Sequence, residues 1–302
     1  MNKISIAIMM VFACLSWQLF AQSSVDQYLT TDDGAKLFVK KSGNGAICIF
    51  IHGGPGAWSK SFEDLKGRNL ERNLSMVYYD QRGCGRSEKS PNGDYSMERM
   101  LKDIDLIRQR FNVDKVYLLS HSFGGILAAN YALKYPDHVK GIILANSTLN
   151  LRYSLENQIT YMGKLLQSKF TPVDHSDTSL MATFLKAKHL LSDKKLDYKM
   201  LSDNKSSVEL VDRIDQQNPS DYDFARHVFQ VEDYWKDYTR RTNDIKVPVL
   251  VITGTKDHAI GENHYKAFGF AHQKVAKIEG GHLLYYENNA VFLKAIFEFI
   301  KN

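Results

Sequence analysis

The feature that most constrains the fold of this chain is an alternation of short apolar runs with helical segments. Runs of six or seven residues rich in Val, Ile, Leu and Tyr, such as 46–51 and 140–146, are typical of strands. Residues 96–111 carry apolar side chains at helical spacing, and a second helix is expected over 123–135. The alternation predicts an α/β fold in which helices cover both faces of a parallel sheet. The expected strands are residues 35–41, 46–51, 75–80, 115–120, 140–146, 248–254 and 274–280, and the last helix is expected at 289–300.

Residues 147–245 interrupt this rhythm, because they are polar and charged and predict several helices in a row. A helical insertion between two strands of a parallel sheet makes a lid at the carboxyl edge of that sheet, which is the edge where ligands bind. The three clearest helices are expected around 152–168, 178–191 and 221–239. We divide the chain into a signal peptide (1–21), a first part of the α/β core (22–146), a helical cap (147–245) and a second part of the core (246–302).

The amino-terminal segment has the pattern of a secretory signal. Lys3 precedes an apolar run over residues 4–20, and cleavage is expected after Ala21. The alternative is a membrane anchor, but the run is short for a span and polar residues interrupt it at 16–18. We therefore expect an exported protein, periplasmic or secreted, with no stable membrane span in the mature chain.

Charge and cysteine content exclude several classes of partner. The formal net charge of +5 comes from 39 basic and 34 acidic residues spread along the chain, so nucleic acid is not expected as a partner. Cys14 falls in the signal segment, and Cys48 lies in an apolar run where a small core residue is expected. Cys84 is the third cysteine. Two remaining cysteines cannot form a disulfide framework, and no metal-ligand spacing accompanies them. The sequence predicts neither a metal site nor an oligomeric state.

Ser122 lies where an expected strand passes directly into an expected helix. The stretch "SHSFGG" (120–125) has a serine between small residues, as a sharp strand-to-helix turn requires. Ser120 replaces the usual glycine at the first small position, and because serine is also small we expect a tighter fit and not a lost turn. The turn would expose Ser122 at the amino end of the helix, where N–H groups stabilise a developing anion. The alternative is that Ser122 only caps this helix.

A serine nucleophile needs a base and a carboxylate that orients the base. Asp257 follows the expected strand at 248–254, and His282 follows the next expected strand after two glycines. Both positions are at carboxyl ends of strands, on the same edge as Ser122, and the order Ser, Asp, His is one that such triads use. Asp257 as a solvated turn residue and His282 as an ordinary loop histidine are the alternatives.

A glycine-rich loop, "HGGPG" (52–56), follows the expected strand at 46–51. Glycine lets the backbone approach a ligand closely, so the N–H of Gly54 is expected to join the N–H of Phe123 in an oxyanion hole. Losing one such donor typically costs about 2.7–4 kcal/mol of transition-state stabilisation. A phosphate cradle is the alternative, but the Gly-Lys-Ser/Thr sequence that it needs is missing here.

Five motifs together resemble the prolyl aminopeptidase (proline iminopeptidase) family of serine peptidases, which has the α/β-hydrolase fold. This resemblance implies about eight strands in a mostly parallel sheet and a helical cap inserted after the sixth strand. It implies release of an N-terminal residue, often proline, from a short peptide, through an acyl-enzyme and without a cofactor. The motifs are "HGGPG" (52–56), "DQRGCGRS" (80–87), "SHSFGG" (120–125), "GTKD" (254–257) and "GGH" (280–282).

The resemblance also implies that acidic residues in or near the cap bind the free amine of the substrate. Glu232 is our candidate for this role, with Asp233 beside it, and both are equally explained as solvated helix positions. His258 stands directly after Asp257, where some relatives carry a glutamate, and this departs from the exopeptidase pattern. The substrate is therefore expected to be a small peptide or a small ester or amide. A carboxylesterase, lactonase or amidase with the same triad is the alternative activity, and an inactive binding protein is a third possibility.

Overall fold

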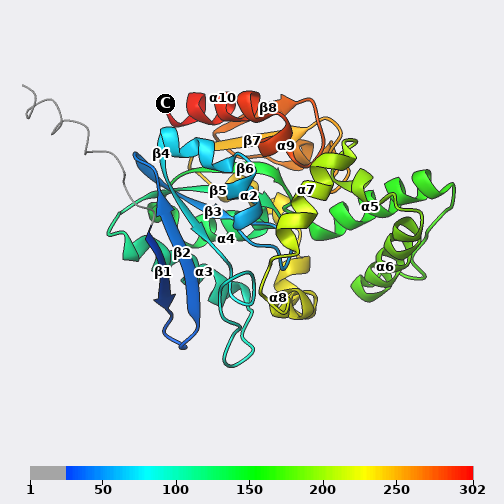
Figure 1. Ribbon diagram of the computed structural model, residues 1–302, viewed down its shortest axis with the longest axis horizontal. Coiled ribbons are helices and arrows are strands. Elements are labelled where there is room, and N and C mark those ends of the chain that lie inside the picture. The colour runs from blue at the N-terminus through cyan, green and yellow to red at the C-terminus, as the bar shows by residue number, and fades with distance from the viewer. Residues whose placement is uncertain (1–24, 302) are drawn as a thin grey trace, which may run out of the picture.

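A single eight-stranded sheet forms the centre of the computed structural model, which describes residues 25–301 (Figure 1). The strand order is β1-β2-β4-β3-β5-β6-β7-β8. The signal segment expected at residues 1–21 lies outside the described residues. The strands are β1 (Val25–Thr30), β2 (Lys36–Ser42), β3 (Ala46–Ile51), β4 (Leu74–Tyr79), β5 (Val116–Ser122), β6 (Val139–Ser147), β7 (Val249–Gly254) and β8 (Gln273–Ile278).

The sheet is mostly parallel, as the sequence predicts. β1 pairs with β2 and β2 pairs with β4 in antiparallel fashion, and every pairing from β4 to β8 is parallel. All seven expected strands form, with ends that differ from the expected bounds by two residues or fewer. β1 was missed because "VDQYLT" contains no apolar run.

Both faces of the sheet are buried, and successive residues of a strand alternate between them. Ile49 packs into one hydrophobic cluster, while the next residue, Phe50, packs into the cluster on the opposite face. Such burial on both faces is what the apolar runs predict. The helices outside the β6–β7 connection are α2 (Lys60–Asp64), η1 (Gly67–Arg72), α3 (Met97–Arg110), α4 (Gly124–Lys134), η2 (Pro136–His138), η7 (His264–Ala267), α9 (Leu284–Glu287) and α10 (Asn289–Ile300).

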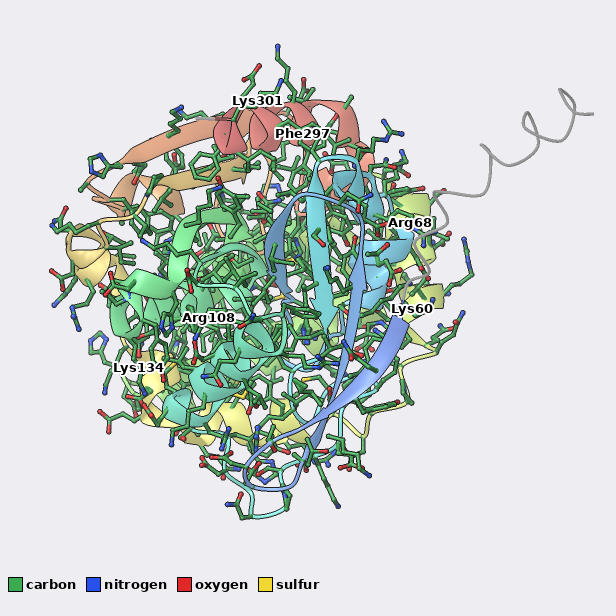
Figure 2. All side chains as sticks on the ribbon, turned by 90° about the vertical axis from the view of Figure 1, so that its left-hand side faces the viewer. Lys60, Arg68, Arg108, Lys134, Phe297 and Lys301 are labelled. Carbon is green, nitrogen blue, oxygen red and sulfur yellow. The ribbon has the colours of Figure 1, made fainter. Side chains whose placement is uncertain are left out.

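The helices divide between the two faces of the sheet. Figure 2 shows Arg108 of α3 and Lys134 of α4 on one side of the strands, and Lys60 of α2 and Arg68 of η1 on the other. α10 shares the second face, because its apolar side chains belong to the same cluster as Phe50. Because helices cover both faces of the sheet, the carboxyl ends of the strands are the part of the sheet that is left for a site.

The β6–β7 segment, residues 148–248, contains the helices that the sequence places between the sixth and seventh strands. The expected helix at 221–239 is wrong: it breaks into a short α-helix and several 3₁₀ turns, with extended backbone at Val231 and Lys236. The break turns Tyr234 inward, where it is fully buried. The helices are α5 (Leu151–Leu166), α6 (Asp177–Asp193), η3 (Asp197–Met200), α7 (Lys205–Asp215), α8 (Asp223–His227), η4 (Val228–Gln230), η5 (Glu232–Trp235) and η6 (Tyr238–Asp244).

The elements of this segment occupy one end of the molecule. Figure 1 shows α5 and α6 extending beyond the sheet, with α7 and α8 closer to the strands. α7 was not expected from the sequence, although Asn204 caps it through bonds to the N–H groups of Ser206 and Ser207. A capping asparagine ahead of residues 205–215 was the signal that could have identified this helix.

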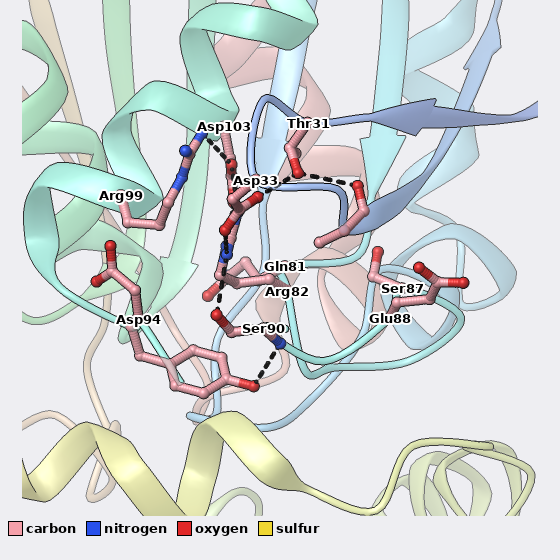
Figure 3. Close-up of polar contacts among 12 residues, drawn as sticks. Thr31, Asp33, Gln81, Arg82, Ser87, Glu88, Ser90, Asp94, Arg99 and Asp103 are labelled. Carbon is pink, nitrogen blue, oxygen red and sulfur yellow. Dashed lines mark hydrogen bonds and ion pairs between the residues drawn. The ribbon is translucent and has the colours of Figure 1, made fainter. Parts of the chain in front are cut away.

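The loop after β4 is held by buried ion pairs (Figure 3). Arg82 is fully buried, and its guanidinium donates to Asp33 in the β1–β2 turn and to Asp103 on α3, with N–O distances of 2.7 Å to each. Asp80 is also fully buried and accepts hydrogen bonds from Ser59 and Arg86. The "DQRGCGRS" motif therefore has a structural role, which fixes the loop beside the "HGGPG" loop.

Between residues 25 and 301, no helix combines the length and the apolar character that crossing a bilayer requires. Within the same residues, no group of three or more His, Cys, Asp or Glu side chains is arranged to hold a metal ion. Cys48 and Cys84 are buried free thiols.

Candidate active site

Ser122 is the last residue of β5 and lies in a strained turn. Its φ is +56°, which is uncommon for a residue with a side chain, and α4 begins two residues later. The turn leaves little room on either side: a Cβ on Gly124 would lie 2.2 Å from the carbonyl oxygen of Ile51. A Cβ on Gly125 would lie 2.6 Å from the Cβ of Ser147. The small residues after Ser122 are therefore required by the crossing of strand and helix backbones.

Ser120, the departure from the usual glycine, is accommodated by a partner serine on the neighbouring strand. Its side chain is fully buried, and its hydroxyl lies 3.0 Å from the hydroxyl of Ser147 on β6. The Ser147 hydroxyl is also 3.1 Å from the carbonyl oxygen of Ser120. The extra hydroxyl thus finds a buried polar partner, and the turn at Ser122 is retained.

The structure brings Asp257 and His282 together at the ends of adjacent strands. Nδ1 of His282 is 3.1 Å from each carboxylate oxygen of Asp257, and both side chains are at least 95% buried. The carboxylate also accepts the N–H groups of Ala259 and Ile260, at 3.0 and 3.1 Å, which fix its orientation. With Nδ1–H donated to Asp257, the unprotonated Nε2 is the nitrogen that can accept a proton.

His121, the residue directly before Ser122, contacts His282. Nε2–H of His121 donates to the carbonyl oxygen of His282 at 3.0 Å, and the two imidazole rings lie 4.4 Å apart. Within residues 25–301, no hydrogen bond joins the Ser122 hydroxyl to the His282 ring. Such bonds are often long in unliganded enzymes and tighten when substrate binds.

The "HGGPG" loop passes directly against Ser122. A Cβ on Gly53 would lie 2.6 Å from the Cβ of Ser122 and 3.3 Å from its hydroxyl oxygen. Gly54 follows with φ of +118°, a conformation that favours glycine. In the described part of the chain, no hydrogen bond uses the N–H of Gly54 or of Phe123. Both groups therefore remain available as oxyanion donors.

His52 holds this loop through a partner that the sequence did not identify. Its Nδ1–H donates to the carbonyl of Gly53 at 2.9 Å, and its Nε2 accepts the N–H of Gln81 at 2.9 Å. The Gln81 side chain donates back to the carbonyl of His52 at 2.7 Å. Burial lowers the pKa of His52, so the ring is neutral and can make both bonds. Gln81 lies in the "DQRGCGRS" motif, and that place was the signal that could have identified it.

The comparisons with known proteins agree with this geometry. The sequence model of the family described as alpha/beta hydrolase fold matches residues 48–289. The chain belongs to the α/β-hydrolase fold family. This confirms the fold that the motifs indicated.

Its relatives include proline iminopeptidases. A proline iminopeptidase of Heyndrickxia coagulans is 33% identical over 46% of each chain. One of Lactobacillus acidophilus is 28% identical over 69% of this chain and 73% of that one. A solved proline iminopeptidase-related protein of Thermus thermophilus has a TM-score of 0.75 at 21% identity, over 92% of this α/β hydrolase and 98% of that chain. The match to the Heyndrickxia coagulans relative spans under half the length of that protein. The resemblance to the prolyl aminopeptidase family is confirmed.

In this α/β hydrolase, Glu232 is not brought into contact with the other candidate residues. Its side chain is exposed, and within residues 25–301 no hydrogen bond or ion pair connects it with Ser122 or His282. Two positions later, the buried Tyr234 ring lies 5.5 Å from the ring of Phe123. The β6–β7 segment therefore contacts Phe123, whose N–H is a candidate oxyanion donor, through the ring of Tyr234. The Glu232 side chain is exposed instead.

α5 of the hydrolase holds the loop that carries Asp257. Asn157 donates to the carbonyl of His258 at 2.9 Å, and Gln158 donates to the carbonyl of Ala259 at 2.8 Å. The ring of His258 stacks on Tyr161 with centroids 3.6 Å apart. His258 is therefore half-buried against α5, and its contacts fix the loop directly after the candidate acid.

Proposed function

We propose that this chain is a serine hydrolase that releases an N-terminal residue, often proline, from short peptides through an acyl-enzyme. The observation that supports it best is the buried hydrogen bond between Asp257 and His282, next to a serine in a strained turn. The proline iminopeptidase relatives support the substrate class. The active residues assigned to the reaction are Ser122, Asp257, His282, Gly54 and Phe123.

In the first half of the reaction, the Ser122 hydroxyl attacks the carbonyl carbon of the substrate. Nε2 of His282 accepts the hydroxyl proton, and Asp257 holds Nδ1–H and stabilises the imidazolium that forms. The negative charge that develops on the carbonyl oxygen is held by the N–H groups of Gly54 and Phe123. His282 then gives its proton to the leaving amine, and the acyl group stays on Ser122.

In the second half, water hydrolyses the acyl-enzyme. His282 accepts a proton from this water, which attacks the ester carbonyl. The tetrahedral intermediate uses the same two N–H groups, and its collapse returns the proton to Ser122. The cycle needs one base that is neutral in the resting enzyme and one carboxylate that orients it, which are the roles of His282 and Asp257.

A carboxylesterase, lactonase or amidase with the same residues is the second candidate function. The outward position of Glu232 favours it, because an aminopeptidase needs a carboxylate that binds the substrate amine. The two functions share every chemical step and differ only in whether the free amine is recognised.

A comparison of three substrates separates these functions. We expect a prolyl arylamide with a free amine to be hydrolysed at least tenfold faster, in kcat/KM, than the same compound acylated on nitrogen. A short ester serves as the third substrate. Equal rates for the free and the acylated arylamide, with faster turnover of the ester, would instead assign the esterase-like function.

Replacement of the nucleophile tests the mechanism itself. We expect Ser122→Ala to lower kcat by at least about 10³-fold for every accepted substrate, since removing one triad member leaves only the oxyanion hole and binding. The matched control is Ser176→Ala, which removes the exposed cap of α6 far along the chain. Activity retained in Ser122→Ala, with a melting temperature unchanged from the wild type, would remove Ser122 from the reaction.

A further inference from the structure

The strand between the nucleophile strand and the acid strand is β6, and its last residue but one is a buried asparagine. Asn146 is 3% exposed and has a φ of +43°. β6 pairs with β5, which carries Ser122, and with β7, which leads to Asp257. Asn146 thus lies at the centre of the carboxyl edge, and the motifs of the sequence assign it no role.

The side chain of Asn146 bonds to both loops that carry the proposed acid and base. Its Oδ1 accepts the N–H of Gly254 at 2.8 Å, and its Nδ2 donates to the carbonyl of Gly281 at 3.0 Å. Gly254 is three residues before Asp257, and Gly281 directly precedes His282. We propose that Asn146 is a positioning residue, whose amide fixes the separation between the acid loop and the base loop. This inference rests on the proposed function.

The two loops approach each other so closely that small changes in separation matter. A Cβ on Gly254 would lie 2.5 Å from the carbonyl oxygen of Gly281. The N–H of Lys256 donates to the carbonyl of Gly280 at 2.9 Å, which ties the loops to each other. Asn146 ties both of them to β6 and hence to the strand beside Ser122. A displacement of about 1 Å in such a site lowers the reaction rate by roughly 10²-fold.

Only a side chain with one donor and one acceptor at this spacing satisfies both loops. An aspartate at position 146 is acceptor-only when ionised, so it would face the carbonyl oxygen of Gly281 without a proton between them. A leucine would leave both backbone groups unpaired in a buried place. Asparagine also tolerates the positive φ that Asn146 adopts better than most residues do. The amide therefore meets the requirements of both the backbone and the two loops.

The base loop is held from two further directions. The carbonyl of His282 accepts from His121 at 3.0 Å, and the N–H of His282 donates to the carbonyl of Leu201, in the β6–β7 segment, at 2.7 Å. These bonds orient His282 toward β5 and toward the β6–β7 segment. The bond from Asn146 also fixes the position of His282 relative to Asp257, because the same amide bonds to the acid loop.

The test uses two variants and a matched control. Asn146→Asp removes the donor and keeps the shape, while Asn146→Gly removes the amide without backbone strain or a buried charge. The control is Asn289→Asp: Asn289 is also buried, donates to the carbonyl of Tyr285 at 2.7 Å and accepts from Asn69 at 2.8 Å. Three quantities are measured: the second-order rate of Ser122 labelling by a fluorophosphonate, the downfield ¹H NMR resonance of the His282 Nδ1 proton, and the melting temperature.

We expect at least a tenfold slower labelling rate in both variants at position 146, with a shifted or broadened Nδ1 resonance. Asn289→Asp should keep both quantities within twofold of the wild type, although its melting temperature falls. A folded Asn146 variant with the wild-type rate and resonance would overturn the proposal. Failure of both variants to fold would also overturn it, by assigning the amide to folding. If the wild type itself is not labelled at Ser122, the proposed function fails, and the resonance still tests whether Asn146 sets the bond between Asp257 and His282.

Discussion

Two imidazoles meet beside the candidate nucleophile, and one of them, His121, is kept neutral by its surroundings. Burial, with the neighbouring His282 ring as the second cause, lowers the pKa of His121 to about 3. His121 is therefore neutral above about pH 4, and its Nε2–H is available to the carbonyl of His282.

The neutral state of His121 predicts the slope of the pH profile. We expect His121 to add no second proton to the acid limb of kcat/KM above about pH 4, so this limb should have the slope of a single proton. His121→Gln should keep this slope, since a glutamine amide can also donate to the carbonyl of His282. The measurement is kcat/KM against pH for the wild type and the variant. A slope of two protons in the wild type would mean that His121 also titrates in this range.

At the scale of elements, α5 is a helix that contacts the loop after Asp257. Its Asn157 and Gln158 side chains pair with carbonyl groups of the loop after Asp257, and Tyr161 stacks on His258. On the same helix, Glu156 is exposed and makes a long ion pair, at 3.6 Å, with Arg152, which also pairs with Asp177. One helix thus offers both a test position and a control position.

We predict that the double variant Asn157→Ala, Gln158→Ala lowers the free energy of unfolding by about 1–3 kcal/mol, because two loop carbonyls lose their donors. It should also lower kcat more than it changes KM, since the loop positions Asp257. Glu156→Ala on the same helix should change the free energy of unfolding by less than about 0.5 kcal/mol. Chemical denaturation and steady-state kinetics measure both effects. Equal results for the two variants would show that these bonds do not position the loop.

The elements that the sequence predicts well are those whose signal is local. β5 and β7 are apolar runs bounded by polar residues, and their register places Ser122 and Asp257 at strand ends. The region at 221–239 was predicted poorly, because the inward turn of Tyr234 depends on contact with Phe123, far away in the sequence. Helical spacing alone cannot show such a tertiary contact.

For the molecule as a whole, the motifs supply the residues proposed to do the chemistry, but they do not show which side chains hold those residues in place. Gln81 lies inside the "DQRGCGRS" motif, yet its bond to the carbonyl of His52 is not evident from the motif, and Asn146 lies in no motif at all. Such bonds exist only after the sheet has brought the strand ends together. The reactive groups that we propose can thus be read from the sequence, while the hydrogen bonds that support them require the three-dimensional structure.

The buried charge network around Arg82 connects parts of the molecule that are distant in sequence, and its loss should destabilise the whole fold. Arg82 is fully buried between Asp33 and Asp103, so Arg82→Met would leave a buried carboxylate without this partner. Breaking such a pair costs about 3–5 kcal/mol. The Lys36–Glu88 pair is about half exposed on both sides, so Lys36→Ala should cost less than about 1 kcal/mol.

Urea unfolding at neutral pH measures both free energies. The direction in which this stabilisation changes with pH follows from Asp33, whose pKa is lowered by the hydrogen bond from Arg82. The stabilisation by this pair is present above the unfolded pKa of about 3.9 and is lost as the pH falls below it. The difference between the wild type and Arg82→Met should therefore shrink in acid. If Arg82→Met lowers the free energy of unfolding at neutral pH no more than Lys36→Ala does, the buried network contributes specificity of packing and not stability. Buried ion pairs can have this role, since replacing them by apolar groups is often neutral or stabilising.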